Sequence, residues 1–155
     1  MDKQELMAMA IRLAKENVQN GGGPFGAVIS KNGEVIATGV NRVTSNCDPT
    51  AHAEVSAIRA ACEKLGVFTL EGCEIYSSCE PCPMCLGAIY WAHLDSLYFA
   101  CNKTDAAKAG FDDDFIYREL DLRPAERRLV TTEMMRAEAM SVFDNWREKT
   151  DKVEY

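Results

Sequence analysis

The segment CEPCPMC (residues 79–85), taken together with TAHAE (residues 50–54), decides the fold and indicates a catalytic zinc site. Histidine and cysteine are common zinc ligands, and a catalytic zinc keeps three protein ligands and one open position. His52, Cys82 and Cys85 supply such a set for one Zn²⁺ per chain. Bound zinc lowers the pKa of a water molecule to about 7, which provides a hydroxide nucleophile at neutral pH.

The spacing of these residues predicts that they lie at helix starts. Cys82 and Cys85 stand at i and i+3, which are neighbours on a helix surface. In a first turn, the positive end of the helix stabilises both thiolates, and the flanking prolines suit such a start. His52 and Glu54, the candidate acid–base residue, stand at i and i+2. They can converge on one water only where the chain is not yet helical, and residues 48–50 are a suitable start.

Cys79 keeps a different zinc arrangement open, because Cys79-x-x-Cys82 has the same spacing as Cys82-x-x-Cys85. A structural zinc could have four ligands: Cys79, Cys82, Cys85 and His52. The protein would then be a structural or binding module that zinc stabilises, and not an enzyme. A C-x-x-C pair alone also occurs in redox-active sites. Glu54 favours the catalytic interpretation, since a structural zinc does not require a nearby carboxylate.

Outward from these two segments, the hydrophobic pattern predicts alternating strands and helices. The expected strands are residues 25–30, 34–40, 73–77 and 96–100, and the expected later helices are residues 50–65, 83–92 and 133–149. A hairpin followed by helix–strand–helix–strand is typical of a three-layer α/β/α domain on a mixed sheet. The strands on either side of the 83–92 helix are expected to be parallel. The whole chain, residues 1–155, is expected to form a single domain.

The N-terminal part has clear local signals. Asp2 and Glu5 resemble a capping box that opens a first helix, and the glycines from Gly21 stop it. The amphipathic stripe expected on this helix is Met7, Ile11, Ala14 and Val18. Asn32-Gly33, between two β-rich runs, predicts a hairpin turn.

Composition restricts the class of protein and its setting. The chain has 155 residues and a formal net charge of −7, which argues against a protein that mainly binds nucleic acid. It has seven cysteines and no signal peptide or membrane-spanning run, so we expect reduced thiols and a cytoplasmic protein without a membrane partner.

The two deciding segments match a known signature. His52-Ala53-Glu54 with Pro81-Cys82-x-x-Cys85 resembles the H-x-E…P-C-x-x-C signature of the zinc nucleobase deaminases. This resemblance implies Cys82 and Cys85, rather than Cys79, as ligands. It also implies a cytidine-deaminase-like fold with a central five-stranded sheet and both motifs at helix N-termini.

Within that superfamily the chain looks most like the small bacterial guanine deaminases. The matching segments are GGPFGAVI (22–29), NCDPTAHAE (46–54), EPCPMCLGAIYWA (80–92), TDAAKAGFDDDFIY (104–117) and the terminal Glu154-Tyr155. The resemblance implies hydrolytic deamination of guanine to xanthine and ammonia, in purine metabolism. Cys47 departs from the Ser-Asn-Asp-Pro run expected before the histidine motif.

The same resemblance implies roles for individual residues. Phe25 would stack on the purine, Asn41 would hydrogen-bond to it, Ala53 would contact it, and Asp113 would assist proton transfer at the departing amine. Tyr155 would close the pocket, with the C-terminal segment of about 121–155 exchanged between the subunits of a homodimer.

The residues alone leave these roles open. Phe25 could belong to the core, Asn41 could cap a turn, and spacing cannot choose which of Asp112, Asp113 and Asp114 points inward. Two other enzymes share the zinc chemistry: a tRNA-specific adenosine deaminase, and a cytosine-type deaminase of small heterocycles. The negative charge and the FDDDF element (111–115) count against the tRNA enzyme.

Overall fold

The computed structural model describes all 155 residues, which form two compact units, Met1–Asp114 and Phe115–Tyr155. The strands are β1 (Gly26–Lys31), β2 (Glu34–Val40), β3 (Glu74–Cys79) and β4 (Ser96–Cys101). The helices of the first unit are α1 (Lys3–Gln19), α2 (Ala53–Leu65), α3 (Pro83–Trp91) and α4 (Lys103–Lys108). Helix α5 (Asp114–Leu120) begins at the unit boundary, and the 3₁₀ helix η1 (Pro124–Glu126) and α6 (Arg136–Glu148) follow it.

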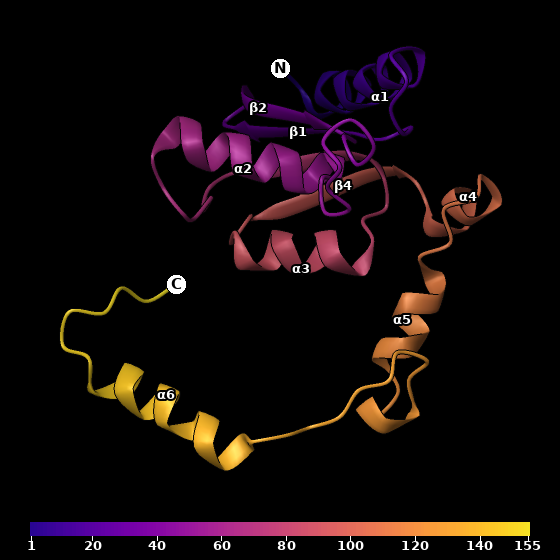
Figure 1. The fold of residues 1–155 in the computed structure, drawn as a ribbon. Coiled ribbons are helices and arrows are strands. Elements are labelled where there is room, and N and C mark those ends of the chain that lie inside the picture. The colour runs from indigo at the N-terminus through magenta and orange to yellow at the C-terminus, as the bar shows by residue number, and fades with distance from the viewer. The chain divides into compact units, whose positions relative to one another are not determined.

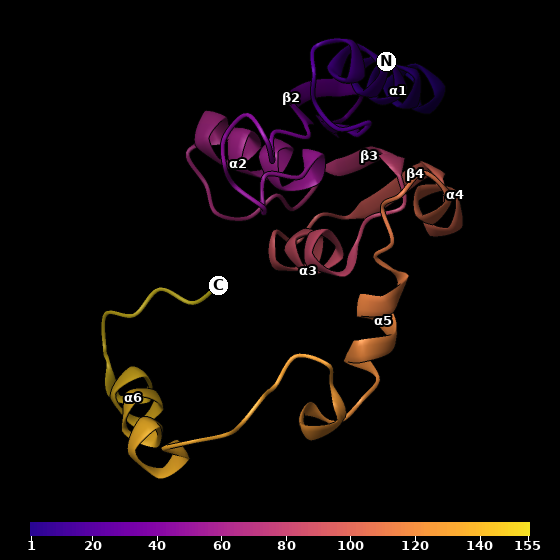
Figure 2. The same cartoon turned by 45° about the vertical axis from the view of Figure 1, so that its right-hand side comes forward.

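The first unit is built on one mixed sheet with the strand order β2-β1-β3-β4. β1 is antiparallel to both β2 and β3, whereas β3 and β4 are parallel because α3 crosses between them. Helix α1 covers one face of the sheet, and α2 and α3 cover the other (Figure 1, Figure 2). The three-layer architecture and the parallel pair are therefore confirmed. The expected count of five strands is not, since this sheet has four and the chain continues after β4 as helix α4.

Alternating side chains of the central strands fill a core on each face of the sheet. Val28 and Tyr76, which are register partners on β1 and β3, pack with Leu6 and Ala10 of α1. The residues between them along the strands point to the opposite face, as the two-residue period of a strand requires. The second cluster is Ala27, Ile29, Ala53, Ala57, Ala61, Leu70, Cys73, Ile75, Ile89 and Ala92.

Helix α1 begins as predicted but turns a different face to the sheet. Asp2 Oδ1 accepts a hydrogen bond from Glu5 N at 2.8 Å, and Asp2 N donates to Glu5 Oε2 at 2.8 Å, so the capping box is confirmed. The buried residues are Leu6, Ala10 and Ala14, of which only Ala14 belongs to the predicted stripe. A Cβ on Gly26 would lie 2.4 Å from the Ala10 carbonyl oxygen. The helix therefore lies so close to β1 that small residues must face the strand.

The hairpin between β1 and β2 has the predicted turn. Asn32 has φ 51° and Gly33 has φ 79°, both in the left-handed region. A two-residue turn with two positive φ values matches the right-handed twist of the strands it joins.

Helix α2 begins at Ala53, three residues later than predicted. Asp48 Oδ1 accepts hydrogen bonds from Thr50 N at 2.9 Å and Thr50 Oγ1 at 2.6 Å, which hold residues 48–50 in a turn instead of a helix. The helix end is as predicted, because Gly66 takes the left-handed C-cap conformation with φ 66°.

The second unit has little buried surface of its own. Helix α6 confirms the predicted C-terminal helix, but neither it nor α5 has a buried residue. Val142 and Trp146, which lie on one face of α6, are exposed, and so is Met135 at its N-cap. Nowhere in the chain is a helix both long and apolar enough to cross a bilayer.

Candidate zinc and catalytic site

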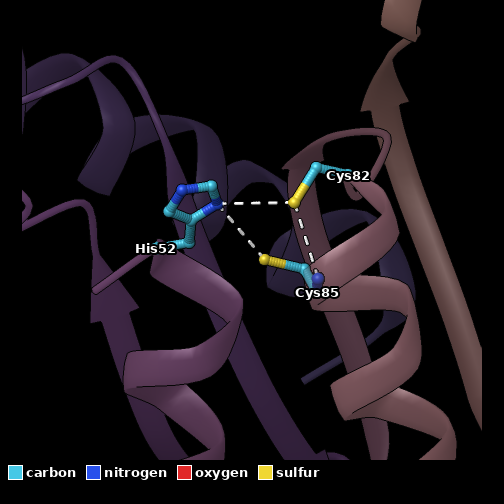
Figure 3. A group of neighbouring side chains, drawn as sticks. All are labelled: His52, Cys82 and Cys85. Atoms are coloured by element: carbon cyan, nitrogen blue, oxygen red, sulfur yellow. Dashed lines mark hydrogen bonds between the residues drawn. The ribbon is translucent and has the colours of Figure 1, made fainter. Parts of the chain in front are cut away.

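Three candidate metal ligands from two helix starts converge in the first unit. His52 Nδ1 lies 3.5 Å from Cys82 Sγ and 3.4 Å from Cys85 Sγ. Figure 3 shows the His52 ring beside the first turn of α2, with both sulfur atoms facing it from the start of α3. All three ligand atoms lie within 4.8 Å of one another.

These separations fit a tetrahedral zinc ion. With bonds of about 2.1 Å to nitrogen and about 2.3 Å to sulfur, tetrahedral angles place a nitrogen and a sulfur ligand roughly 3.5 Å apart. The two N···S distances, 3.5 Å and 3.4 Å, match this value. Two sulfurs and one imidazole form the donor set of a catalytic zinc that keeps one position open.

The helix starts explain how the ligands reach one point. Cys82 is the N-cap of α3, and Cys85 lies in its first turn, where its N–H donates to Cys82 Sγ at 3.5 Å. His52 is the N-cap of α2 and has extended backbone angles, φ −71° and ψ 159°. Because His52 stands outside the helix, it and Glu54 can both face the same cavity, as the sequence predicts.

The surroundings of the two thiols favour negative charge at this point. Hydrogen bonds from Cys85 and His52 lower the pKa of Cys82 to about 4, and the hydrogen bond with Cys82 raises the pKa of Cys85. Zinc binds cysteine in its thiolate form, so these surroundings suit a metal held by the two sulfurs.

Glu54 lies in the first turn of α2 and is 5% exposed. Burial raises its pKa, although a hydrogen bond from Cys85 acts in the opposite direction. Its side chain lines the cavity that His52 and Cys82 also line. A buried carboxyl with a raised pKa is suited to both taking and returning a proton.

The cavity in front of these residues has a volume of about 530 Å³ and is lined by both predicted base-binding residues. Phe25 forms one wall, with its ring edge-to-face against Phe111 at a centroid distance of 5.0 Å. Asn41 also lines the cavity, and its Oδ1 accepts a hydrogen bond from Val43 N at 3.2 Å. Such a volume is typical of a small-ligand site.

The structure separates the three consecutive aspartates. Asp113 lines the cavity, and its Oδ1 is buried without a hydrogen-bond partner. Burial raises its pKa, and the negative charge of Cys82 adds to the shift. Asp112 also lines the cavity but accepts a hydrogen bond from Asp114 N at 3.1 Å. Asp114 forms an ion pair with Lys103 at 3.7 Å. Asp113 is therefore the one of the three with an unpaired oxygen in the site.

Three other candidate residues are placed differently. Cys79 lines the cavity but is outside the ligand group. Its Sγ is 3.8 Å from the Asn102 carbonyl oxygen, and burial raises its pKa to about 11. Ala53 packs in the core, so its side chain is not part of the cavity wall. Tyr155 belongs to the second unit and is exposed, and its expected role stays a prediction.

The Gly21–Gly23 turn was expected only to end a helix, but it also lines the cavity. Gly21 has φ 88°, a conformation that favours glycine, and its tripeptide approaches Asn41. Three consecutive glycines before the aromatic Phe25 are the one signal that could have indicated this wall.

Comparison with known proteins agrees with this site. The family model of the cytidine and deoxycytidylate deaminase zinc-binding region matches residues 1–101. Guanine deaminase of Bacillus subtilis (strain 168) is 52% identical over 156 residues, which cover 100% of both chains. The X-ray structure of guanine deaminase from Bacillus subtilis superposes with a TM-score of 0.97 over 100% of this chain and 99% of that one.

More distant relatives share the same architecture. A guanine deaminase structure from Nitrosomonas europaea has a TM-score of 0.70 at 35% identity and covers 72% of this chain and 65% of that one. The tRNA-specific adenosine deaminase of Aquifex aeolicus (strain VF5) is 42% identical over 100 residues, 64% of this chain and 66% of that protein. The chain thus belongs to the cytidine and deoxycytidylate deaminase zinc-binding family, and His52, Cys82 and Cys85 form its candidate zinc site.

Proposed function

We propose that this protein catalyses the hydrolytic deamination of guanine to xanthine and ammonia. The observation that carries the proposal is one cavity of about 530 Å³. It is lined by His52 and Cys82 of the zinc-ligand cluster, by the buried Glu54 and by Asp113, whose Oδ1 has no hydrogen-bond partner. The two solved relatives described as guanine deaminases support the choice of base.

The acid–base work would be divided between two carboxyl groups. Zinc held by His52, Cys82 and Cys85 would supply the Lewis acid that activates water. Glu54 takes a proton from the attacking water and returns it to a ring nitrogen of the base. Asp113 assists the proton transfer that lets the exocyclic amine leave as ammonia. General acid–base catalysis of this kind contributes about 10²–10⁴-fold to a rate.

The remaining lining residues would hold the base flat against the reacting groups. The Phe25 ring stacks on the purine, and the Asn41 amide hydrogen-bonds to its edge. Ala53 has its side chain in the core, so it would contact the base through its main chain at the helix start, where N–H groups lack intrahelical partners.

We also propose that residues 1–155 work as one domain whose C-terminal segment, about 121–155, is exchanged between the subunits of a homodimer. The exposed apolar residues of α6 support a partner surface, and β4 is an edge strand with an exposed Phe99. In this arrangement the partner's segment would supply the fifth strand at β4 and place its Tyr155 over the cavity. The seven free cysteines are consistent with a reducing, cytoplasmic setting.

The direct test is ammonia release by zinc-quantified protein, with guanine, cytosine, adenine, guanosine and a tRNA anticodon stem-loop as separate substrates. Turnover of guanine alone supports the proposal. Turnover of the stem-loop but not guanine would favour the tRNA-specific adenosine deaminase, which the Aquifex relative represents. Turnover of cytosine alone would favour the small-heterocycle deaminase. No turnover, together with a fourth protein ligand on zinc, would favour the structural module.

A further inference from the structure

One side-chain amide joins the two segments that form the base-binding side of the cavity. Asn17, near the end of α1, donates from Nδ2 to the Gly23 carbonyl oxygen at 2.7 Å and to the Asn41 carbonyl oxygen at 2.9 Å. The main-chain carbonyl oxygen of Asn17 accepts a hydrogen bond from Gly22 N at 2.8 Å. Asn17 does not line the cavity, but the segments it contacts, Gly21–Gly23 and Asn41, both do.

The contact needs a group with two protons to donate. The bond from Asn41 N to the Phe25 carbonyl oxygen, at 3.2 Å, is the last main-chain bond between the segments that extend β1 and β2 toward the cavity. Beyond it, the carbonyls of Gly23 and Asn41 are both acceptors and cannot pair with each other. The NH₂ group of Asn17 donates one hydrogen to each of them. It therefore connects the two segments where the next main-chain hydrogen bond between them would otherwise form.

Asn41 is also restrained from its other sides. Its Oδ1 accepts from Val43 N at 3.2 Å. A Cβ added to Gly23 would lie 3.0 Å from Asn41 Cγ, so the glycine turn already approaches the amide closely. The Asn17 bridge thus fixes both the main chain of Asn41 and the turn against which its side chain rests.

We propose that Asn17 is a positioning residue for base recognition: it holds Asn41 and the glycine turn in the geometry that binds the purine. The inference rests on the proposed function, in which Asn41 contacts the base. Asn17 itself touches neither the base nor the zinc ligands, so its effect is on binding and not on the acid–base steps.

The variant Asn17→Asp tests this because it keeps the shape of the side chain and replaces the two-proton donor with an acceptor that faces two carbonyl oxygens. We expect KM for guanine to rise about tenfold, with kcat changed less than about threefold and zinc still at one per chain. Gln19→Glu makes the same amide-to-carboxylate change two residues along, at an exposed position, and should match the wild type. If Asn17→Asp does not fold, Asn17→Ala is used instead, in which water can hydrogen-bond to the two carbonyls. We expect the same rise in KM with little change in kcat.

A double-mutant cycle separates positioning from a general loss of structure. In an Asn41→Ala background, Asn17→Asp should lower kcat/KM by a clearly smaller factor than in the wild type, because the Asn41 side chain that it positions is gone and only the glycine turn remains to be held. An undiminished effect in that background would overturn the inference, as would a KM equal to that of Gln19→Glu or a loss confined to kcat. Wild-type protein that deaminates another base instead of guanine would refute the proposed function alone, and the cycle would then be run with that base.

Discussion

Glu54 is the residue on which the proposed chemistry depends most. Glu54→Gln keeps the size of the side chain and removes its ability to take and return a proton. We expect guanine turnover to fall by at least about 10²–10⁴-fold, with zinc retained because the three ligands are unchanged. Ammonia release and zinc content are measured together. Glu63→Gln, at an exposed position of the same helix, is the control, and near-normal turnover by Glu54→Gln would remove the residue from the mechanism.

The aspartate cluster allows a comparison between neighbours. Asp113 has a buried oxygen without a partner, whereas Asp114 pairs with Lys103. Asp113→Asn should lower kcat by about 10² or more, since the amide cannot transfer a proton to the departing amine. Asp114→Asn should leave kcat close to the wild-type value. A steady-state assay of both variants decides the assignment, and the reverse ranking would contradict it.

Asp48 gives a prediction on pH. Hydrogen bonds from Thr50 lower the pKa of Asp48, so folding favours its charged form. The stability this contributes is fully present above the ordinary aspartate pKa of about 4 and is lost as the pH falls through the lower, folded value. The difference in Tm between wild type and Asp48→Asn should therefore be constant from about pH 7 to pH 5 and shrink below about pH 4. A difference in Tm that does not change with pH would show that the hydrogen bonds have no such effect.

Among the individual residues, the zinc ligands could be predicted from the sequence. Which of the three consecutive aspartates points into the cavity could not. Cys82 and Cys85 are fixed relative to one another by a single helical turn, so spacing is sufficient. The inward position of Asp113 depends on the ion pair of Asp114 and on the burial of the loop, and neither is encoded within three adjacent identical residues.

Among the elements, the contact between β2 and α2 sets the position of His52. A Cβ on Gly39 would lie 2.2 Å from the Ala53 carbonyl oxygen and 2.6 Å from Ala57 N, both main-chain atoms that cannot move aside alone. Gly39→Ala should therefore lower the free energy of unfolding by about 1–3 kcal/mol and weaken zinc binding, because the start of α2 must shift.

Gly87 provides the matched control for Gly39. It lies within helix α3, and an added Cβ would have no neighbour within 4 Å. Gly87→Ala should raise the free energy of unfolding by about 0.5–1 kcal/mol, since alanine loses less backbone entropy in a helix. Urea denaturation measures both variants. Equal stability of Gly39→Ala and wild type would show that the close approach is not a constraint.

Element types were predictable from periodicity, but the buried faces and one helix start were not. The pattern placed Met7, Ile11 and Val18 on the inner side of α1, yet close packing against Gly26 selects the alanines instead. The predicted helix α2 also extended back to Thr50, but the backbone N–H of Thr50 donates to the side chain of Asp48 instead. In both cases a tertiary or side-chain contact outweighs a local preference.

For the whole molecule, the sequence predicted the layered fold of the first unit but not its strand count. Each strand and helix up to Cys101 carries its own pattern, so the topology follows from element order. A fifth strand would have to come from beyond β4, where the 130–135 stretch has no regular secondary structure and includes the 91%-exposed Val130. If the fifth strand forms only by pairing with β4 of a partner subunit, it is absent from the structure of a single chain.

Exchange of the C-terminal segment predicts complementation between two inactive chains. Glu54→Gln lacks the acid–base group, and a chain ending at residue 154 lacks Tyr155; each homodimer should have little activity. In a co-expressed heterodimer, the site with an intact Glu54 would receive Tyr155 from the other subunit. One of the two sites of each heterodimer would then be complete. Ammonia release by tandem-tagged heterodimers should therefore reach about half of the wild-type rate per site.

The result separates exchange from a segment that returns to its own chain. If Tyr155 closed the cavity of its own subunit, the heterodimer would contain no complete site, and its activity would equal the mean of the two parent homodimers. A chain that is monomeric by light scattering at micromolar concentration would also reject exchange. Neither change removes α6, so the apolar residues Val142 and Trp146 remain available to a partner in every sample. Because the two tags recover only associated chains, a lack of activity in the heterodimer cannot be assigned to failed association.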